Sequence, residues 1–171
     1  MLRPLLAAVL IALAAPLSAA EVRELNWSDM VPADAPAQVA EPAPIHDLSQ
    51  LADALSEAGP ASQQQSPAAP VVKELDGQAV KLPGYIVPLD VTDEGRVTEF
   101  LLVPYFGACI HVPPPPANQI VLVNAERGVE IDSLFAPVRV TGRMRVEAAS
   151  TDLADAGYTL DLTALEKIDD F

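Results

Sequence analysis

Hydrophobic and polar residues alternate strictly along residues 138–148, and this pattern predicts a β-strand. Successive side chains of a strand point to opposite faces, so a period of two indicates one buried and one solvated face. The basic residues of this stretch all fall on the predicted outer face, where Glu147 or Asp161 can pair with them across the sheet. The predicted inner positions are Val138, Val140, Gly142, Met144 and Val146, and the outer positions are Arg139, Thr141, Arg143 and Arg145.

Four further stretches carry strand signals. The first contains Pro83 and Gly84, and we expect a strand pair, or one long strand that bends there, because proline and glycine inside a strand indicate a bulge. Asp93–Gly95 reads as a hairpin turn, and residues 150–156 as a short helical turn. The four predicted strands cover residues 80–89, 97–105, 118–124 and 158–165.

Five short strands with close connections predict a mainly β fold. We expect a small five-stranded barrel of the oligonucleotide/oligosaccharide-binding (OB) type, and a five-stranded sandwich is the alternative. A closed barrel pairs its strand edges, so it holds together without disulfides. The chain has one cysteine and therefore no internal disulfide.

The N-terminus predicts export from the cytoplasm. Arg3 precedes an apolar run over residues 5–17, and Ser18-Ala19-Ala20 supplies small residues for a signal peptidase. The run is too short for a permanent membrane span. We therefore expect residues 1–20 to be a cleaved signal peptide and the mature protein to be periplasmic.

The mature chain divides into two predicted parts. Residues 21–70 form an N-terminal extension with a helix over residues 46–58 and a Pro/Gln-rich linker over residues 61–70. Trp27 lies in a hydrophobic segment that we expect to pack on the main domain or on a partner. Residues 71–171 form the OB-like barrel domain.

Charge narrows the possible partners. The chain has 10 basic and 24 acidic residues, a net charge of −14. This acidity repels nucleic acid and anionic membranes and tolerates cationic partners or metal ions. We expect a protein that does not bind nucleic acid and that is not embedded in the membrane.

Cys109 and His111 are the candidate metal ligands. Side chains two residues apart in extended backbone point to the same side, and Pro113–Pro116 stiffens the loop. Sulfur and imidazole nitrogen suit zinc or copper(I). A zinc site needs further ligands, and none has a telling spacing; a second copy in a homodimer is another source. The candidates are His46, Glu99, Asp90 and Asp132, with Met30 or Met144 for copper(I).

Two other interpretations of Cys109 remain open. Cysteine is among the most buried residue types, so Cys109 can be a structural core thiol. It can also be a nucleophile with His111 as its base, but neighbouring side chains at this spacing rarely meet and no third group orients the histidine. A C-x-x-C motif is absent. We therefore do not expect an enzyme.

Several runs resemble one protein family: residues 82–90 (LPGYIVPLD), 97–119 with its GACIHVPPPPANQ segment, and 137–142 (PVRVTG). They are similar to domain-of-unknown-function family 3299, small exported bacterial proteins, over residues 22–171. The resemblance implies accessory proteins of MacB/FtsX-type ABC transporters that handle zinc. We thus expect a periplasmic zinc-binding accessory protein, with Cys109, His111 and His46 as ligands. The alternative is a periplasmic protein- or ligand-binding module without metal, in which the cysteine is structural.

Overall fold

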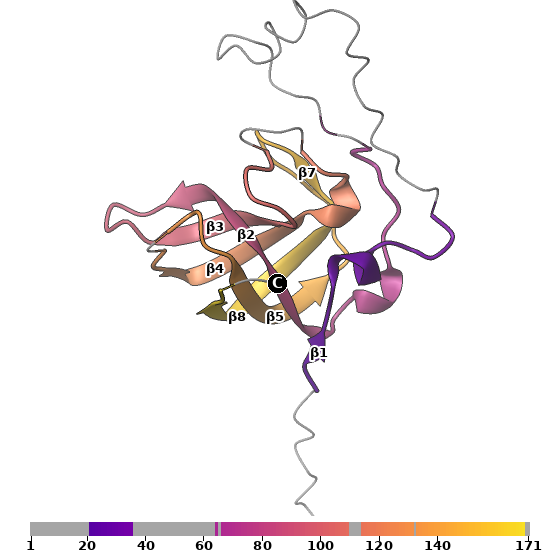
Figure 1. The fold of residues 1–171 in the computed structure, drawn as a ribbon, viewed down its shortest axis with the longest axis horizontal. Coiled ribbons are helices and arrows are strands. Elements are labelled where there is room, and N and C mark those ends of the chain that lie inside the picture. The colour runs from indigo at the N-terminus through magenta and orange to yellow at the C-terminus, as the bar shows by residue number, and fades with distance from the viewer. Residues whose placement is uncertain (1–20, 36–63, 65, 110–113, 132, 170–171) are drawn as a thin grey trace, which may run out of the picture.

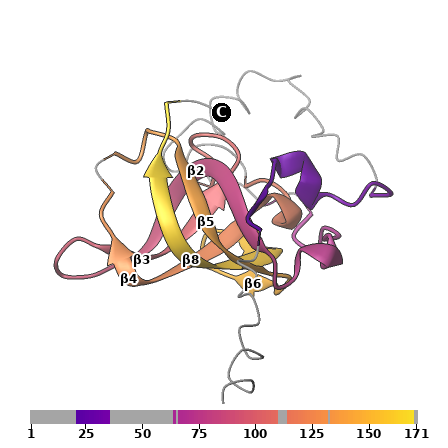
Figure 2. The same cartoon turned by 90° about the horizontal axis from the view of Figure 1, so that it is seen from below.

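Five long strands close into a barrel in the computed structural model, which describes residues 21–35, 64, 66–109, 114–131 and 133–169 (Figures 1 and 2). The barrel strands are β2 (Ala79–Val91), β3 (Val97–Val103), β4 (Val121–Val129), β5 (Val138–Arg145) and β8 (Tyr158–Lys167). The shorter elements are β1 (Arg23–Glu24), η1 (Trp27–Met30), η2 (Lys73–Leu75), η3 (Ala117–Gln119), β6 (Ala149–Ser150) and β7 (Asp155–Ala156).

The strand order confirms the predicted barrel rather than the sandwich. The ladder runs β1-β2-β3-β4-β8-β5, and β5 pairs back to β2, which closes the sheet. The pair β4–β8 is parallel, whereas β2–β3, β3–β4, β5–β8 and β2–β5 are antiparallel. Numbered among the barrel strands alone, the cyclic order is 1-2-3-5-4, the Greek-key closure of a five-stranded OB-type barrel.

Strand β2 changes partner at Gly84, which explains the proline and glycine in its sequence. Residues 79–84 pair with β5, and residues 85–91 pair with β3. A Cβ atom at Gly84 would lie 2.8 Å from the carbonyl oxygen of Val103, so only glycine allows this approach. The stretch is thus one long strand, one of the two predicted possibilities.

The inward residues of the barrel form the inner cluster. It includes Phe100, Leu102, Val140 and Tyr158, each of which has 0% exposure. The predicted alternation of β5 is confirmed, since Val138, Val140 and Met144 are buried. On the outer face Arg145 forms an ion pair with Asp161.

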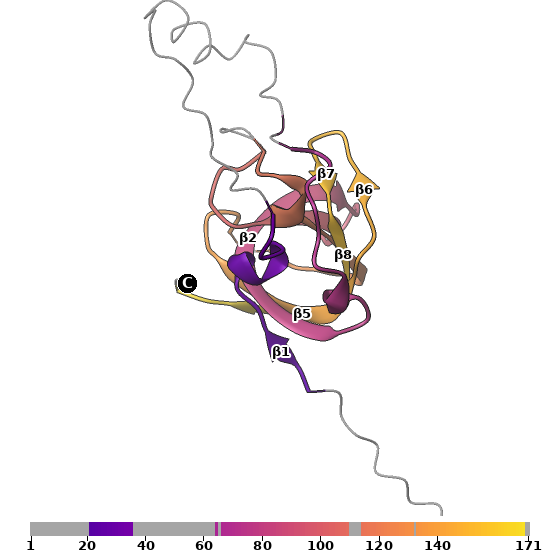
Figure 3. The same ribbon diagram turned by 90° about the vertical axis from the view of Figure 1, so that its right-hand side faces the viewer.

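The Trp27 segment folds back on the barrel, the first of the two predicted possibilities (Figure 3). Strand β1 pairs in parallel with the start of β2, and the indole Nε1 of Trp27 donates to the carbonyl oxygen of Pro83 at 2.9 Å. Met30 is fully buried, and its carbonyl oxygen accepts from the Tyr158 hydroxyl at 2.6 Å. The same hydroxyl accepts from the backbone N–H of Val72 at 2.7 Å. One phenol therefore joins the barrel to two preceding segments.

A second apolar cluster covers the outside of the β2–β3–β4 sheet. This outer cluster lies beneath the loop after β3 and the β6–β7 hairpin, which stand beside the start of β8 (Figure 3). Its buried members are Val87, Leu101, Val103, Ala108, Ile120, Ala154 and Ala156.

The hairpin corrects the predicted helical turn at residues 150–156. Ser150 pairs with Asp155 in an antiparallel ladder, and the backbone N–H of Ala154 donates to the Thr151 side-chain oxygen at 3.1 Å. The Thr151 side chain therefore accepts from a backbone N–H group at the tip of a hairpin, and it does not cap a helix. Gln64 braces the other edge: its amide oxygen accepts from the N–H of Asp155, and its amide nitrogen donates to the carbonyl of Asp155, both at 2.7 Å.

The third predicted strand begins later than expected, at Val121. Residues 117–119 instead form η3, because the fully buried Asn118 donates its side-chain amide to the carbonyl oxygen of Pro70 at 2.8 Å. The predicted helix over residues 46–58 and the signal peptide over residues 1–20 lie outside the described residues. Within the described part of the chain, no helix has the length and apolar character needed to cross a bilayer.

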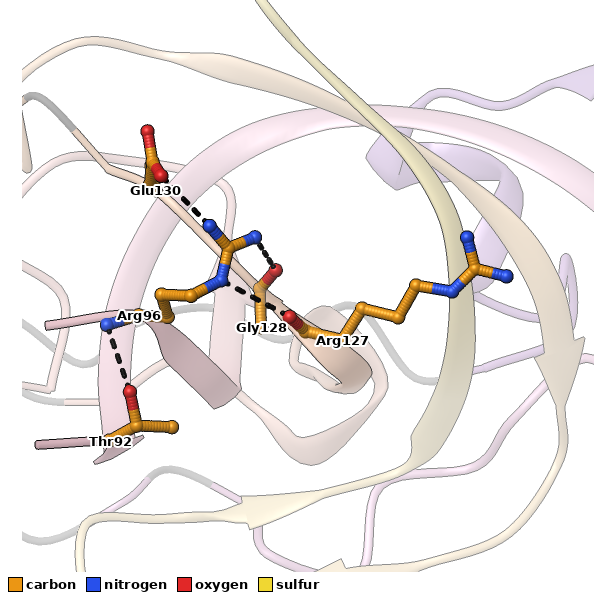
Figure 4. Close-up of polar contacts among 5 residues, drawn as sticks. All are labelled: Thr92, Arg96, Arg127, Gly128 and Glu130. Atoms are coloured by element: carbon orange, nitrogen blue, oxygen red, sulfur yellow. Dashed lines mark hydrogen bonds and ion pairs between the residues drawn. The ribbon is translucent and has the colours of Figure 1, made fainter. Parts of the chain in front are cut away.

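Arg96 holds the part of β4 that bulges against β3. Figure 4 shows its polar contacts. Its guanidinium donates to the carbonyl oxygens of Arg127 at 3.2 Å and Gly128 at 2.5 Å, and pairs with Glu130 at 2.8 Å. Gly128 has φ +62°, a left-handed conformation that glycine adopts without strain. The Arg96 guanidinium therefore stabilises the bulge in β4.

Candidate functional site

Cys109 lies in a tight turn after β3. Gly107 and Cys109 both have left-handed backbone angles, φ +81° and φ +67°, and the second is unusual for a residue with a Cβ atom. The Cys109 side chain is partly buried and packs on the outer cluster with Tyr85, Leu89 and Leu122. This turn fixes the thiol against the sheet.

Burial raises the pKa of the Cys109 thiol to about 11. At neutral pH the thiol is therefore protonated, and a protonated thiol is neither a good nucleophile nor a metal ligand. The nucleophile interpretation loses its main requirement in the metal-free protein. The pKa of neighbouring Tyr105 is also raised, first by desolvation and second by the charge that Cys109 carries when ionised.

The predicted metal ligands are not brought together among the residues described. No group of three or more His, Cys, Asp or Glu side chains there is placed to hold a metal ion. Asp90 and Glu99 face each other on β2 and β3, and the Asp90 carboxylate accepts from the Thr98 hydroxyl at 2.6 Å. His46, His111 and Asp132 lie outside the described residues.

The two methionines considered for copper(I) belong to the barrel interior. Met30 and Met144 both have 0% exposure and sit in the inner cluster, whereas Cys109 packs on the outer cluster. Both thioethers therefore pack in a different cluster from the Cys109 thiol.

An exposed aromatic patch lies beside the Cys109 turn. The rings of Tyr85 and Phe106 are 5.9 Å apart at 66°, and those of Phe106 and Phe135 are 5.4 Å apart at 44°. Phe135 is 76% exposed and Phe106 is 47% exposed, values unusual for phenylalanine. We define the aromatic patch as Tyr85, Tyr105, Phe106, Leu134 and Phe135.

The partner switch of β2 creates this patch. Tyr85 pairs with Val103 at the end of β3, and the preceding Gly84 pairs with Val138 at the start of β5. The loop that leaves β3 and the loop that enters β5 consequently meet over the outward-facing Tyr85 ring. Clustered exposed apolar side chains of this kind are typical of interaction surfaces.

Sequence reasoning located only part of the patch. Tyr85 and Tyr105 fall within the predicted strands over residues 80–89 and 97–105, and the structure places both of them, with Phe106, at the rim of the barrel. Leu134 and Phe135 were not predicted as functional. The sequence does hold a signal for these two residues. They are adjacent, large and apolar, and they lie in a predicted loop between two strands, where the barrel offers no core position.

The face that OB-type barrels use for ligands is covered here. Oligonucleotides and oligosaccharides bind such barrels across strands 2 and 3 of the barrel, which correspond to β3 and β4. In this protein, Leu101 and Ile120 on that side are fully buried beneath the chain's own loop and hairpin. The exposed aromatic patch lies elsewhere, where the loop that leaves β3 meets the loop that enters β5.

Two hollows among the described residues carry few polar side chains that could act on a ligand. One of about 410 Å³ lies between residues 67–71 and the β6–β7 hairpin and is lined mainly by alanine. Its carboxylate, Asp155, accepts from the Ser150 hydroxyl at 2.5 Å. The other, of about 580 Å³, lies between η1 and η2. Neither hollow includes the aromatic patch or Cys109.

Comparison with known proteins identifies the family. A crystal structure of a DUF3299 family protein from Pseudomonas aeruginosa PAO1 is 58% identical, with a TM-score of 0.74 over 86% of this chain and 97% of that chain. An OBody bound to hen egg-white lysozyme matches 63% of this chain and 96% of its own at 18% identity, with a TM-score of only 0.38. No curated protein matches the chain. The model of the family described as "Protein of unknown function (DUF3299)" matches residues 27–167, and the chain belongs to this family.

Proposed function

We propose that the protein is a non-enzymatic, periplasmic accessory module that docks on an envelope protein through the aromatic patch. An ABC-transporter assembly is the partner that the sequence resemblance implies, and the signal-like residues 1–20 support the periplasmic location. The observation that carries the proposal is the exposure of Phe135 and Phe106 on one continuous surface.

Energetics support a docking role for this surface. Burying a phenylalanine side chain contributes about 1.5–3 kcal/mol, and that free energy is unused while the ring faces water. Tyr85 is held in the sheet by its pairing with Val103 of β3, which gives the patch a rigid base. Rigid aromatic anchors bind at a small cost in conformational entropy.

Site-specific photocrosslinking in the native cell tests this proposal. A photoreactive phenylalanine at position 135 is expected to capture a defined envelope protein, and osmotic shock is expected to release the uncrosslinked protein. Val91 is the matched control, since it is 50% exposed at the far end of β2. The same captured protein at both positions, or no capture at position 135, would contradict docking through the patch.

Zinc binding is the second candidate function. It is favoured by the position of Cys109, whose partly buried thiol sits at the rim of the patch instead of inside the barrel. With His111 and His46 as the other ligands, zinc would have to displace the thiol proton. Because the thiol pKa is about 11, affinity should rise about tenfold per pH unit through neutrality.

Zinc affinity of the mature protein tests this second candidate directly. We expect Cys109→Ser, His111→Ala and His46→Ala each to weaken binding relative to the parent. Glu94→Gln is the control, because it removes an exposed carboxylate in the turn between β2 and β3 that is not among the candidate ligands. Equal binding by the parent and the three ligand variants would exclude zinc at this site.

A further inference from the structure

We infer that the aromatic patch binds an extended, proline-containing segment of its partner, and that Arg139 pairs with a carboxylate of that segment. This inference rests on the proposed docking function and adds the chemistry of the docked chain. It follows from the exposed rings, the aromatic composition and the charge of the patch.

The patch presents side chains to a partner. Gly84 pairs with β5 and Tyr85 pairs with β3, and the carbonyl oxygen of Pro83 accepts from Trp27. The exposed rings of Phe106 and Phe135 stand beyond this paired backbone, so they are the first groups that a docked chain contacts.

The aromatic composition of the patch favours a polyproline II chain over a helix. Proline-rich segments are recognised by aromatic side chains, whereas an amphipathic helix lays its apolar face into a general hydrophobic groove. Three rings of the patch form a tilted row with centroid distances of 5.9 and 5.4 Å. One turn of polyproline II is about 9 Å long and docks on exposed aromatic rings at low entropic cost.

The charge beside the patch is positive despite the acidity of the chain. Arg139 pairs with Pro83 in the β2–β5 ladder, so it lies diagonally from Tyr85 on the same outer face. Its cross-strand neighbour Glu166 forms its ion pair with Lys81 at 3.8 Å. Among the residues described, no hydrogen bond or ion pair engages the Arg139 guanidinium. A guanidinium in this position is suited to a carboxylate on the docked segment.

Peptide binding by the mature protein tests the inference. The probes are two fluorescein-labelled nonapeptides, each with eight prolines around a central residue, which is aspartate in one and asparagine in the other. We expect the aspartate peptide to bind several-fold more tightly. Phe135→Ala should weaken both peptides about tenfold, the loss typical of an aromatic anchor. Arg139→Gln should abolish the preference for aspartate.

Arg143→Gln is the matched control. Arg143 lies on the same strand and outer face as Arg139, four residues further along, and donates to the carbonyl oxygen of Gly77 at 3.1 Å. This variant should keep the aspartate preference. Loss of that preference in both variants, or equal binding of the two peptides by the parent, would overturn the role of Arg139.

Failure of the inference is distinguishable from failure of the proposed function. If position 135 captures an envelope protein in the cell while neither peptide binds, docking stands and the proline-rich occupant is wrong. If neither experiment succeeds, the docking function itself is wrong. Peptide binding that Phe135→Ala leaves unchanged would place the peptide elsewhere and would also overturn the inference.

Discussion

The two apolar clusters of this protein are packed on opposite faces of one sheet, yet they are closed by different means. The inner cluster is enclosed by strands whose alternation assigns every second residue to the interior. The outer cluster is enclosed by the loop after β3 and by the β6–β7 hairpin, whose strands have two residues each. The Gln64 amide holds that hairpin in place. The barrel interior therefore depends on ladder pairing, whereas the outer cover depends on a few side-chain contacts, and we expect it to open first.

Leu101 and Leu102 give the sharpest test of this difference, because they are adjacent on β3, fully buried and on opposite faces. Each Leu→Ala change should lower the free energy of unfolding by about 2–5 kcal/mol, through lost burial and a residual cavity. Only Leu101→Ala should also speed thiol labelling of Cys109 under native conditions. Equal labelling rates in the two variants would show that the clusters open together.

Tyr158→Phe should produce the next largest effect. The Tyr158 hydroxyl joins Met30 and Val72, so its removal leaves two backbone groups without their partner. A loss of about 1–3 kcal/mol is expected in urea denaturation. Amide exchange should increase in residues 25–31 and 71–75 but not in the β6–β7 hairpin. Equal exchange increases in the hairpin would contradict the separation of the two regions.

Gln64→Ala should open the outer cover with a smaller cost, about 1 kcal/mol, because it removes hydrogen bonds without removing apolar area. The side chain contacts both backbone groups of Asp155 and the carbonyl oxygen of Pro115. Cys109 labelling should become faster. Gln78→Ala is the control, since its amide reaches only the local Glu74 carbonyl; the same acceleration in this variant would contradict the bracing role of Gln64.

The same contrast explains which features could be predicted from the sequence. Periodicity identifies strands because alternation records burial directly, and the prediction of β5 with its inward Val140 and outward Arg139 is confirmed. The hairpin at residues 149–156 was mistaken for a helical turn because two-residue strands carry no period. Phe135 was missed because its importance comes from a meeting of two loops that only the β2 partner switch produces.

The pH dependence of stability should show the smallest effect. Burial raises the pKa of the Cys109 thiol from 9.0 to about 11, so the folded protein holds this proton more tightly than the unfolded chain. The stabilisation is complete below about pH 9 and is lost as pH rises toward 11, because the unfolded thiol ionises first. Unfolding free energies of the parent and Cys109→Ala, compared at pH 8 and pH 10.5, isolate this contribution from the tyrosines that both proteins share. The parent should lose more stability than the variant, although partial exposure of the thiol keeps the difference small. An identical loss in both proteins would mean that the outer cover does not exclude water from the sulfur, and the contrast between the clusters would then rest on the leucine pair alone.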